Sequence, residues 1–210
     1  MWLLAPGDSW ANGAELDHNE EPFGSLLSKK LGRRYLHTAQ DGSSIPHLIL
    51  QLKQNLSKIP DTEKDIICVF LLTSPDRDLC WSQHRAINTG ALFADPPPYE
   101  TPREIFLNAQ DPVHRDWFTE FYTKELATYR TNTTLLALQS LCRYHGIIDY
   151  YAWAWDTATL WPEIDTHRFF AQGLKDIRKH IGYRPGHHPN FAQHQKICDL
   201  FNEMISTQNN

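Results

Sequence analysis

The chain has 210 residues, 41% of them hydrophobic, which is enough for one domain with a full apolar core. Its 20 basic and 25 acidic side chains give a formal net charge of −5, so there is no excess of positive charge to bind nucleic acid. The four cysteines are widely spaced and form no Cys-x-x-Cys pair, which predicts reduced thiols rather than a disulfide framework. We therefore expect synthesis in a reducing compartment and no nucleic-acid partner.

The start of the chain gives an expectation about location. A short apolar run is interrupted by Pro6-Gly7, and neither a basic segment nor a long apolar segment accompanies it. Signal peptides and transmembrane spans need longer apolar stretches than this. The sequence therefore predicts a cytoplasmic protein with no membrane partner.

The first part of the chain alternates predicted strands and helices. The apolar run at residues 1–5 predicts a buried strand, and apolar side chains at helical spacing predict a helix over 23–32. Residues 34–39 predict a short second strand, and the Asp-Gly-Ser-Ser turn at 41–44 leads into a second amphipathic helix. The continuous apolar run at 65–72 is typical of a central parallel strand that is covered on both faces.

The second part is less regular. Residues 77–114 lack a period and contain "DPPPYETP", which predicts an irregular insertion, either a lid over a substrate or a partner surface. Residues 117–145 predict one long helix or two stacked pieces, and 147–155 predict another strand. Residues 156–186 are mixed, with a short helix and a weak edge strand as the interpretation, and 191–205 form a closing amphipathic helix.

This alternation predicts a single domain over residues 1–210, built as a three-layer α/β/α sandwich around a mostly parallel central sheet. Ligands of such sheets bind outside the carboxyl ends of the strands. Three polar breaks fall at those predicted ends, namely Gly7-Asp8-Ser9, Asp41-Gly42-Ser43 and residues 73–76. We expect the functional site there.

The residues at these breaks carry a family resemblance. The stretches "GDSW" at 7–10, "QDGSS" at 40–44, "LLTSPDR" at 71–77 and "GHHPN" at 186–190 resemble, in order and spacing, the motifs of the SGNH or GDSL-type hydrolase superfamily. The resemblance covers nearly the whole chain. It implies a flavodoxin-like form of the predicted sandwich and serine esterase chemistry that requires no organic cofactor and no metal.

The resemblance also implies roles for individual residues. Ser9 would attack an acyl carbonyl, and His188 would remove its proton, because a serine hydroxyl is a weak nucleophile without an adjacent base. The backbone N–H groups of Ser9 and Gly42, with Ser74 as a further donor, would form the oxyanion hole, where each donor lowers the barrier by about 3 kcal/mol. By family analogy the substrate is a small-molecule or carbohydrate ester, with O-acetyl groups on carbohydrate favoured.

The third motif departs from the family pattern. The family reads Gly-x-Asn-Asp and uses the asparagine as an oxyanion donor, whereas this chain reads Thr73-Ser74-Pro75-Asp76. Proline has no N–H to donate. Ser74, Thr73 and Arg77 are the alternatives that would supply the missing donor.

The last motif departs as well. The family reads Asp-x-x-His, and its aspartate orients the imidazole, but Pro185 stands in that place here. The site would then be a dyad of Ser9 and His188, unless a carboxylate such as Asp165 enters from elsewhere. The competing hypothesis is a catalytically weakened SGNH-like scaffold that acts as a binding or structural component.

A narrower resemblance concerns origin and partners. "TSPDR" together with "GDSW" is similar to SGNH-like proteins of tailed bacteriophages. That likeness implies a location in the host cytoplasm or in a virion, and either a second copy of the chain or a virion component as partner.

Several of these residues have a simpler interpretation. Ser9 alone would read as a helix N-cap, and Gly42 as a turn residue with positive φ. Asp8 is interpreted as a structural residue that binds backbone at the turn. His194 lies at helical spacing with apolar residues, which favours a core histidine over a metal ligand, and no metal site is expected.

The remaining candidates are substrate contacts. Trp10, next to the proposed nucleophile, would either wall an acyl or sugar pocket or lie in the core. Asp76, Arg77 and His187 are further candidate contacts, and His187 is also the competing base. The indoles of Trp153 and Trp155 fall on one face of a predicted strand, where core packing explains them; both lie in the run 147–155.

Overall fold

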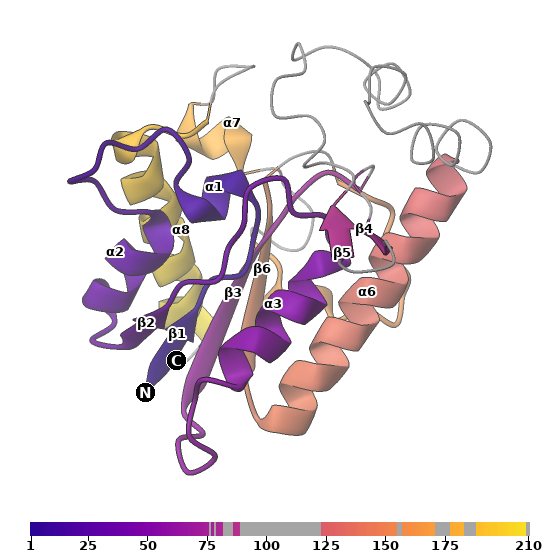
Figure 1. Ribbon diagram of the computed structural model, residues 1–210, viewed down its shortest axis with the longest axis horizontal. Coiled ribbons are helices and arrows are strands. Elements are labelled where there is room, and N and C mark those ends of the chain that lie inside the picture. Colours follow the sequence, from indigo (N-terminus) through magenta and orange to yellow (C-terminus); the bar gives the residue numbers. More distant parts are fainter. Residues whose placement is uncertain are drawn as a thin grey trace.

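A parallel sheet forms the centre of the computed structural model, as the sequence predicts (Figure 1). The strands β1 (Trp2–Leu4), β2 (Arg34–Leu36), β3 (Ile66–Leu72) and β6 (Ile148–Trp153) lie in the order β2-β1-β3-β6, and all three pairings are parallel. This is the flavodoxin-like order, in which the chain reverses its direction of travel across the sheet at β1 and β3. The residues that the structure describes are 1–75, 77, 79–81, 86–88, 123–154, 157–170, 177–182 and 188–208.

Helices cover both faces of this sheet. α2 (Phe23–Lys30) and α8 (Phe191–Gln208) contribute to one buried cluster, and α3 (His47–Leu56) and α6 (Lys124–His145) contribute to the other. Side chains of the fully buried strand β3 alternate between the two clusters, as the period of two in a strand requires. The predicted three-layer α/β/α sandwich is therefore confirmed.

The predicted element boundaries differ in a few places. The second strand ends at Leu36 rather than at residue 39, because Leu4, its last partner in β1, is the end of that strand. The second helix starts at His47, directly after Pro46. α6 is one continuous helix in the described part of the predicted range, and it ends at His145, with Gly146 as its C-cap at φ +68°.

Short elements fill the less regular part of the sequence. Within 156–186 lie a 3-10 turn, η2 (Thr166–Arg168), and a short helix, α7 (Arg178–Ile181), and Phe169 forms a parallel bridge to Tyr151 at the edge of β6. The expected short helix and edge pairing are thus present. The segment 77–114, predicted to be irregular, contains an antiparallel pair formed by β4 (Leu79–Trp81) and β5 (Ala86–Asn88), and its remainder lies outside the described residues apart from Arg77.

The buried side chains agree with two sequence predictions. Cys68, Cys142 and Cys198 are free and buried, and burial raises the pKa of each thiol, for Cys198 to about 11. Trp153 is 1% exposed and packs with the α3 and α6 side of the core, whereas Trp155 lies outside the described residues. Within the described ranges, no helix is both long enough and apolar enough to cross a bilayer.

Candidate active site at the carboxyl edge of the sheet

The loops that follow β1, β2 and β3 meet at one edge of the sheet. These strands are adjacent and parallel, so their carboxyl ends point the same way. The short helix α1 (Ser9–Asn12) lies at this edge, at the same end of the molecule as α7 (Figure 1). The first three polar breaks of the sequence therefore gather where the strand pattern predicts.

Ser9 is the first residue of α1, and a neighbour performs the capping. Asp8 precedes the helix and accepts a hydrogen bond from the backbone N of Trp10 at 3.0 Å. The N-cap role that is the simpler interpretation of Ser9 thus belongs to Asp8, which leaves the Ser9 hydroxyl without that task. Gly7 allows this tight entry, because a Cβ on it would lie 2.3 Å from the Cβ of Ala11.

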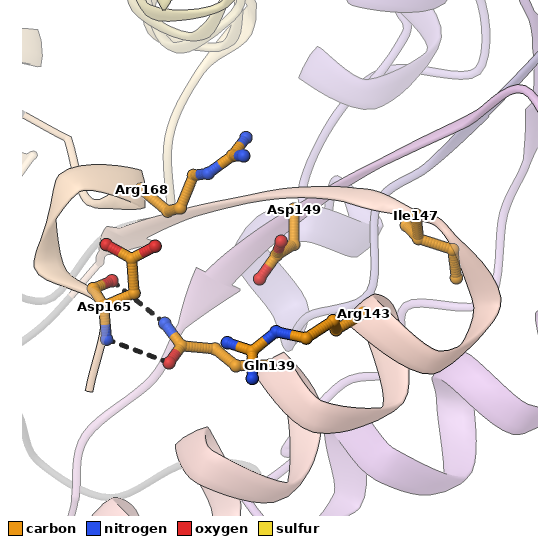
Figure 2. A pocket seen from close by; sticks show the side chains of 6 residues that line it. All are labelled: Gln139, Arg143, Ile147, Asp149, Asp165 and Arg168. Atoms are coloured by element: carbon orange, nitrogen blue, oxygen red, sulfur yellow. Dashed lines mark hydrogen bonds between the residues drawn. The ribbon is translucent and has the colours of Figure 1, made fainter. Parts of the chain in front are cut away.

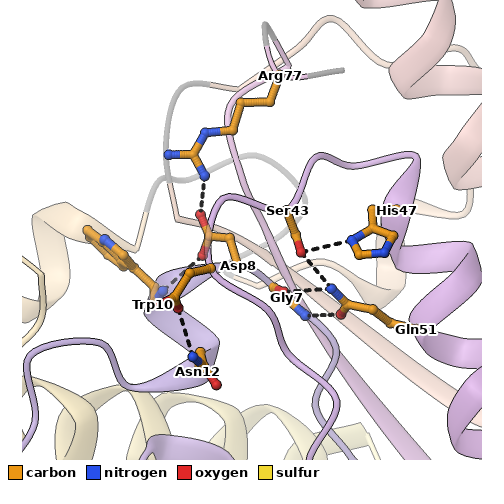
Figure 3. Close-up of polar contacts among 9 residues, drawn as sticks. Gly7, Asp8, Trp10, Asn12, Ser43, His47, Gln51 and Arg77 are labelled. Atoms are coloured by element: carbon orange, nitrogen blue, oxygen red, sulfur yellow. Dashed lines mark hydrogen bonds and ion pairs between the residues drawn. The ribbon is translucent and has the colours of Figure 1, made fainter. Parts of the chain in front are cut away.

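A buried glutamine of α3 holds the loop that precedes Ser9. The Gly7 N donates to Gln51 Oε1 at 2.8 Å, and Gln51 Nε2 donates to the Gly7 carbonyl at 3.0 Å (Figure 3). The same Nε2 donates to Ser43 Oγ at 2.8 Å, and Ser43 Oγ lies 3.0 Å from Nδ1 of His47. Burial lowers the pKa of His47, which favours a neutral ring whose Nδ1 accepts from the Ser43 hydroxyl.

Further bonds join the loop of Gly42 to the loop of Ser9. The backbone N of Gln40 donates to the Gly7 carbonyl at 3.2 Å, and Asn12 Nδ2 donates to Asp41 Oδ1 at 2.7 Å. Gly42 itself has φ +71°, in the left-handed region that glycine adopts without a steric penalty. The turn role predicted for Gly42 is confirmed, and the two residues that precede it, Gln40 and Asp41, are bonded to the loop of Ser9.

An ion pair ties the third loop to the first. Arg77 Nη1 lies 2.9 Å from Asp8 Oδ2, and the Asp8 side chain is completely buried whereas that of Arg77 is 25% exposed. The Arg77 N also donates to the Ser74 carbonyl at 3.2 Å, which closes the turn after β3 and leaves Ser74 half-buried. The structural role predicted for Asp8 is confirmed. Arg77 has a partner that the sequence did not identify.

His188 lies just before α8, in a segment that is locally fixed. Asn190 and Gln193 form reciprocal bonds, with Asn190 Oδ1 accepting from the Gln193 N at 3.0 Å and Gln193 Oε1 accepting from the Asn190 N at 2.9 Å. This is a capping box at the start of the helix. Nδ1 of His188 lies 3.0 Å from Oε1 of Glu15, in the turn that follows α1.

His194 is a core histidine, as expected. It is fully buried, its ring is stacked on that of Phe23, and its Nδ1 accepts a hydrogen bond from the Phe23 N at 3.2 Å. Burial, followed by the charge of His188, lowers the pKa of His194 to about 4. The ring is therefore neutral at physiological pH.

Other candidates lie elsewhere or outside the described residues. Trp10 is fully buried in the apolar core, which is the second of the two roles expected for it, so its indole does not line an open pocket. Asp165 caps η2 by accepting a hydrogen bond from the His167 N at 3.0 Å, and the carboxylate beside His188 is that of Glu15. Asp76 and His187 lie outside the described residues.

The sequence missed Gln51 and Glu15. Gln51 carried a usable signal, because it falls between Leu48 and Leu52 on the apolar stripe of α3, where a polar side chain is buried and needs partners. Glu15 carried no such signal, because several acidic residues lie near it in the sequence and only the folded structure shows which of them contacts His188.

A small polar cavity lies at the opposite, amino edge of the sheet (Figure 2). It has a volume of about 140 Å³ and is lined by Gln139, Arg143, Ile147, Asp149, Asp165 and Arg168. Burial raises the pKa of Asp149, whose Oδ2 accepts a hydrogen bond from the Tyr151 hydroxyl at 2.7 Å. Asp149 is the second residue of β6, so this cavity is separated by the length of the strand from the carboxyl edge.

Comparison with known proteins identifies the fold. No protein-family model and no curated protein sequence matches the chain. Among solved structures the chain is similar to TesA, with a TM-score of 0.54, 12% identity and 99% of each chain covered. It is also similar to LAE5, an α/β hydrolase enzyme from the metagenome of Lake Arreo in Spain, with a TM-score of 0.49, 14% identity and coverage of 98% and 94%.

A third similar structure is a catalytic mutant of Axe2, an acetylxylan esterase from Geobacillus stearothermophilus, with a TM-score of 0.47, 12% identity and coverage of 97% and 93%. At these identities the likeness concerns the fold. The similarity to TesA and the parallel sheet agree with the α/β fold class predicted from the sequence.

Proposed function

We propose that the protein is a serine ester hydrolase of SGNH type, in which Ser9 is the nucleophile and His188 is the general base. The observation that supports this most directly is the convergence of loops around α1. The loop of Gly42 is bonded to the loop of Ser9, and His188 contacts the turn that follows Ser9. A serine, a histidine and backbone donors from separate parts of the chain are the components that acyl transfer requires.

The proposed reaction is a two-step transfer. The Ser9 hydroxyl attacks the acyl carbonyl while His188 takes its proton, and His188 then returns the proton to the departing alcohol. Water releases the acyl group from Ser9 in the second step. His188 is again the base in that step, because it activates the attacking water.

Two backbone amides are proposed as the oxyanion hole. The Ser9 N–H belongs to the first turn of α1, where N–H groups have no partner within the helix. Gly42 lies in a turn and has no side chain, so a carbonyl oxygen can approach its backbone N–H closely. Ser74, on the turn after β3, is the proposed third donor, because Pro75 has no N–H. Of the other two alternatives, Arg77 is paired with Asp8, and Thr73 is buried.

The proposed substrate class comes from the family resemblance. We propose a carboxylic ester, with O-acetyl groups on carbohydrate as the first candidates. The alcohol portion of the ester is proposed to contact Arg77, whose side chain is partly exposed, and also Asp76 and His187.

Ester hydrolysis by purified variants tests this function. Wild type is expected to hydrolyse p-nitrophenyl acetate or an acetylated oligosaccharide, and Ser9→Ala and His188→Ala are each expected to lower kcat by a factor on the order of 10³ or more. Ser206→Ala, on the exposed last turn of α8, is the matched control and retains the wild-type rate. Hydrolysis that survives Ser9→Ala contradicts the proposal, and a folded wild type without any hydrolysis favours the scaffold hypothesis.

A further inference from the structure

Glu15 is the carboxylate in contact with His188. Its Oε1 lies 3.0 Å from Nδ1 of the imidazole, with the His188 side chain 32% and the Glu15 side chain 63% exposed. In the sequence, Pro185 stands where the family motif has the aspartate that orients this ring. A carboxylate from another part of the chain thus contacts the ring nitrogen that a triad acid would contact.

We propose that Glu15 is the third member of a Ser9–His188–Glu15 triad, as the residue that positions the imidazole. This inference rests on the proposed function. With Nδ1–H donating to Glu15, the lone pair of a neutral imidazole is on Nε2, which is the atom that accepts the proton of Ser9. When His188 gains that proton, the Glu15 carboxylate stabilises the cation and remains ionised.

The nucleophile and Glu15 belong to one local unit. The Ser9 carbonyl accepts hydrogen bonds from the N of Gly13 and from the N of Ala14, both at 3.0 Å, and Glu15 is the next residue. The separation between the nucleophile and the positioning carboxylate is therefore set by a single turn. The fold has only to bring His188 against that turn.

The backbone at Glu15 adds an independent argument. Its φ is +69°, and among the described residues it is the one non-glycine residue with a positive φ. A side chain with a Cβ is unfavourable in this region, where glycine is the usual residue. Strained backbone of this kind concentrates at functional sites. A role for the Glu15 carboxylate in catalysis would explain why a residue other than glycine stands at this position.

Two other carboxylates among the described residues of this edge have partners of their own. Asp8 is buried against Arg77, and Asp41 accepts from Asn12. Asp165, the alternative expected from the sequence, caps η2 and lines the cavity at the opposite edge. Because Glu15 is largely exposed, solvent and salt weaken its interaction with His188, and its contribution should be smaller than that of a buried triad aspartate.

Substitution of Glu15 tests the triad. Glu15→Gln retains the size of the side chain and removes its charge, and Glu15→Gly removes the carboxylate while relieving the positive φ, so that it should fold at least as well as wild type. Both are expected to lower kcat for p-nitrophenyl acetate by about 10- to 100-fold with little change in KM. Asp17→Asn, which removes a charge from the same exposed loop, is the matched control and keeps the wild-type rate.

Two readouts separate positioning from a structural role. Added formate should restore part of the activity of Glu15→Gly and none of that of Ser9→Ala. Long-range 1H–15N spectra should show the Nδ1–H tautomer of neutral His188 in wild type and its loss in Glu15→Gly.

The outcomes distinguish this inference from the proposed function. If Ser9→Ala abolishes hydrolysis while both Glu15 variants retain the full rate, the triad is wrong and the serine hydrolase stands. Absence of the Nδ1–H tautomer in wild type also overturns the triad, whatever the activity. If wild type neither hydrolyses esters nor reacts at Ser9, the triad falls together with the proposed function.

Discussion

Two buried glutamines, Gln51 in α3 and Gln139 in α6, hold loops at opposite edges of the sheet in the same way. Each side-chain amide forms two hydrogen bonds with the backbone of one residue, as a neighbouring strand would. Gln51 binds Gly7 at 2.8 and 3.0 Å, and Gln139 binds Asp165 at 2.9 and 3.0 Å. The local geometry of the two contacts is therefore equivalent.

The difference lies in what each glutamine connects. Gln51 has a further bond to Ser43, so it couples the loop that precedes Ser9 to the loop that carries Gly42. Gln139 fixes a single loop beside the small cavity at the amino edge. The same device thus positions two proposed oxyanion donors at one edge and has a structural role at the other. Substitution of Gln51 should therefore lower both stability and activity, whereas substitution of Gln139 should lower stability alone.

Loss of the ion pair between Arg77 and Asp8, at the carboxyl edge, is expected to have the largest effect on stability. Arg77→Met removes the ion pair that Arg77 forms with the fully buried Asp8 carboxylate, and we expect the free energy of unfolding to fall by about 3 to 5 kcal/mol. Urea denaturation measures this. Arg143→Met, at an exposed arginine of the amino-edge cavity, should change stability by no more than about 0.5 kcal/mol. Equal losses in the two variants would contradict the contrast between the edges.

The glutamines themselves provide the direct comparison. Gln51→Leu leaves the buried backbone groups of Gly7 without partners and should lower the free energy of unfolding by about 2 to 3 kcal/mol. Gln139→Leu removes two part-buried bonds to the exposed Asp165 and should lower it by about 1 kcal/mol. Ester hydrolysis should fall on the order of 100-fold for Gln51→Leu alone, because a misplaced loop disturbs the reacting geometry. Comparable activity in the two folded variants would refute a positioning role for Gln51.

A titration tests the packing of α8 against α2. The pKa of His194 is lowered to about 4, below an unfolded value near 6.5, so its stabilising contribution is complete above about pH 6.5 and is lost as the pH falls toward 4. Between pH 7 and pH 5 this costs about 2 kcal/mol of unfolding free energy. His194→Gln, which cannot titrate, should lack this part of the pH dependence in urea midpoints, and an unchanged dependence would be the contrary result.

The bond between Gln51 and Ser43 can be removed by itself. Ser43→Ala removes the third bond of Gln51 and leaves its two bonds to Gly7, so that the remaining contact is like that of Gln139. We expect a loss of about 1 kcal/mol in unfolding free energy and a smaller decrease in kcat/KM than for Gln51→Leu. A decrease as large as that of Gln51→Leu would show that the link between the loops, rather than the hold on Gly7, governs activity.

The sequence predicted the layers of this fold because burial is periodic. The continuous apolar run of β3 and the apolar stripe of α3 must both be removed from water, and packing against the other layers achieves this. The edge pairing of Phe169 and the β4–β5 pair were harder to identify, since short segments carry little periodic signal.

The parts of the site that follow directly from the ends of strands could be predicted from the sequence. The parts that depend on contacts between distant loops could not. The placement of Ser9 and Gly42 at one edge follows from the parallel order of their strands. The choice of Glu15 as the partner of His188 depends on how the turn after α1 meets the start of α8, which no local pattern encodes.

The proposed function depends on Ser9 being an activated nucleophile. Treatment of the folded protein with a fluorophosphonate, followed by intact mass measurement and peptide mapping, measures this reactivity. We expect one adduct, located on Ser9, which forms in wild type and is absent in Ser9→Ala and strongly slowed in His188→Ala. A folded wild-type protein that forms no adduct, or forms it on another residue, would show that Ser9 is not the nucleophile.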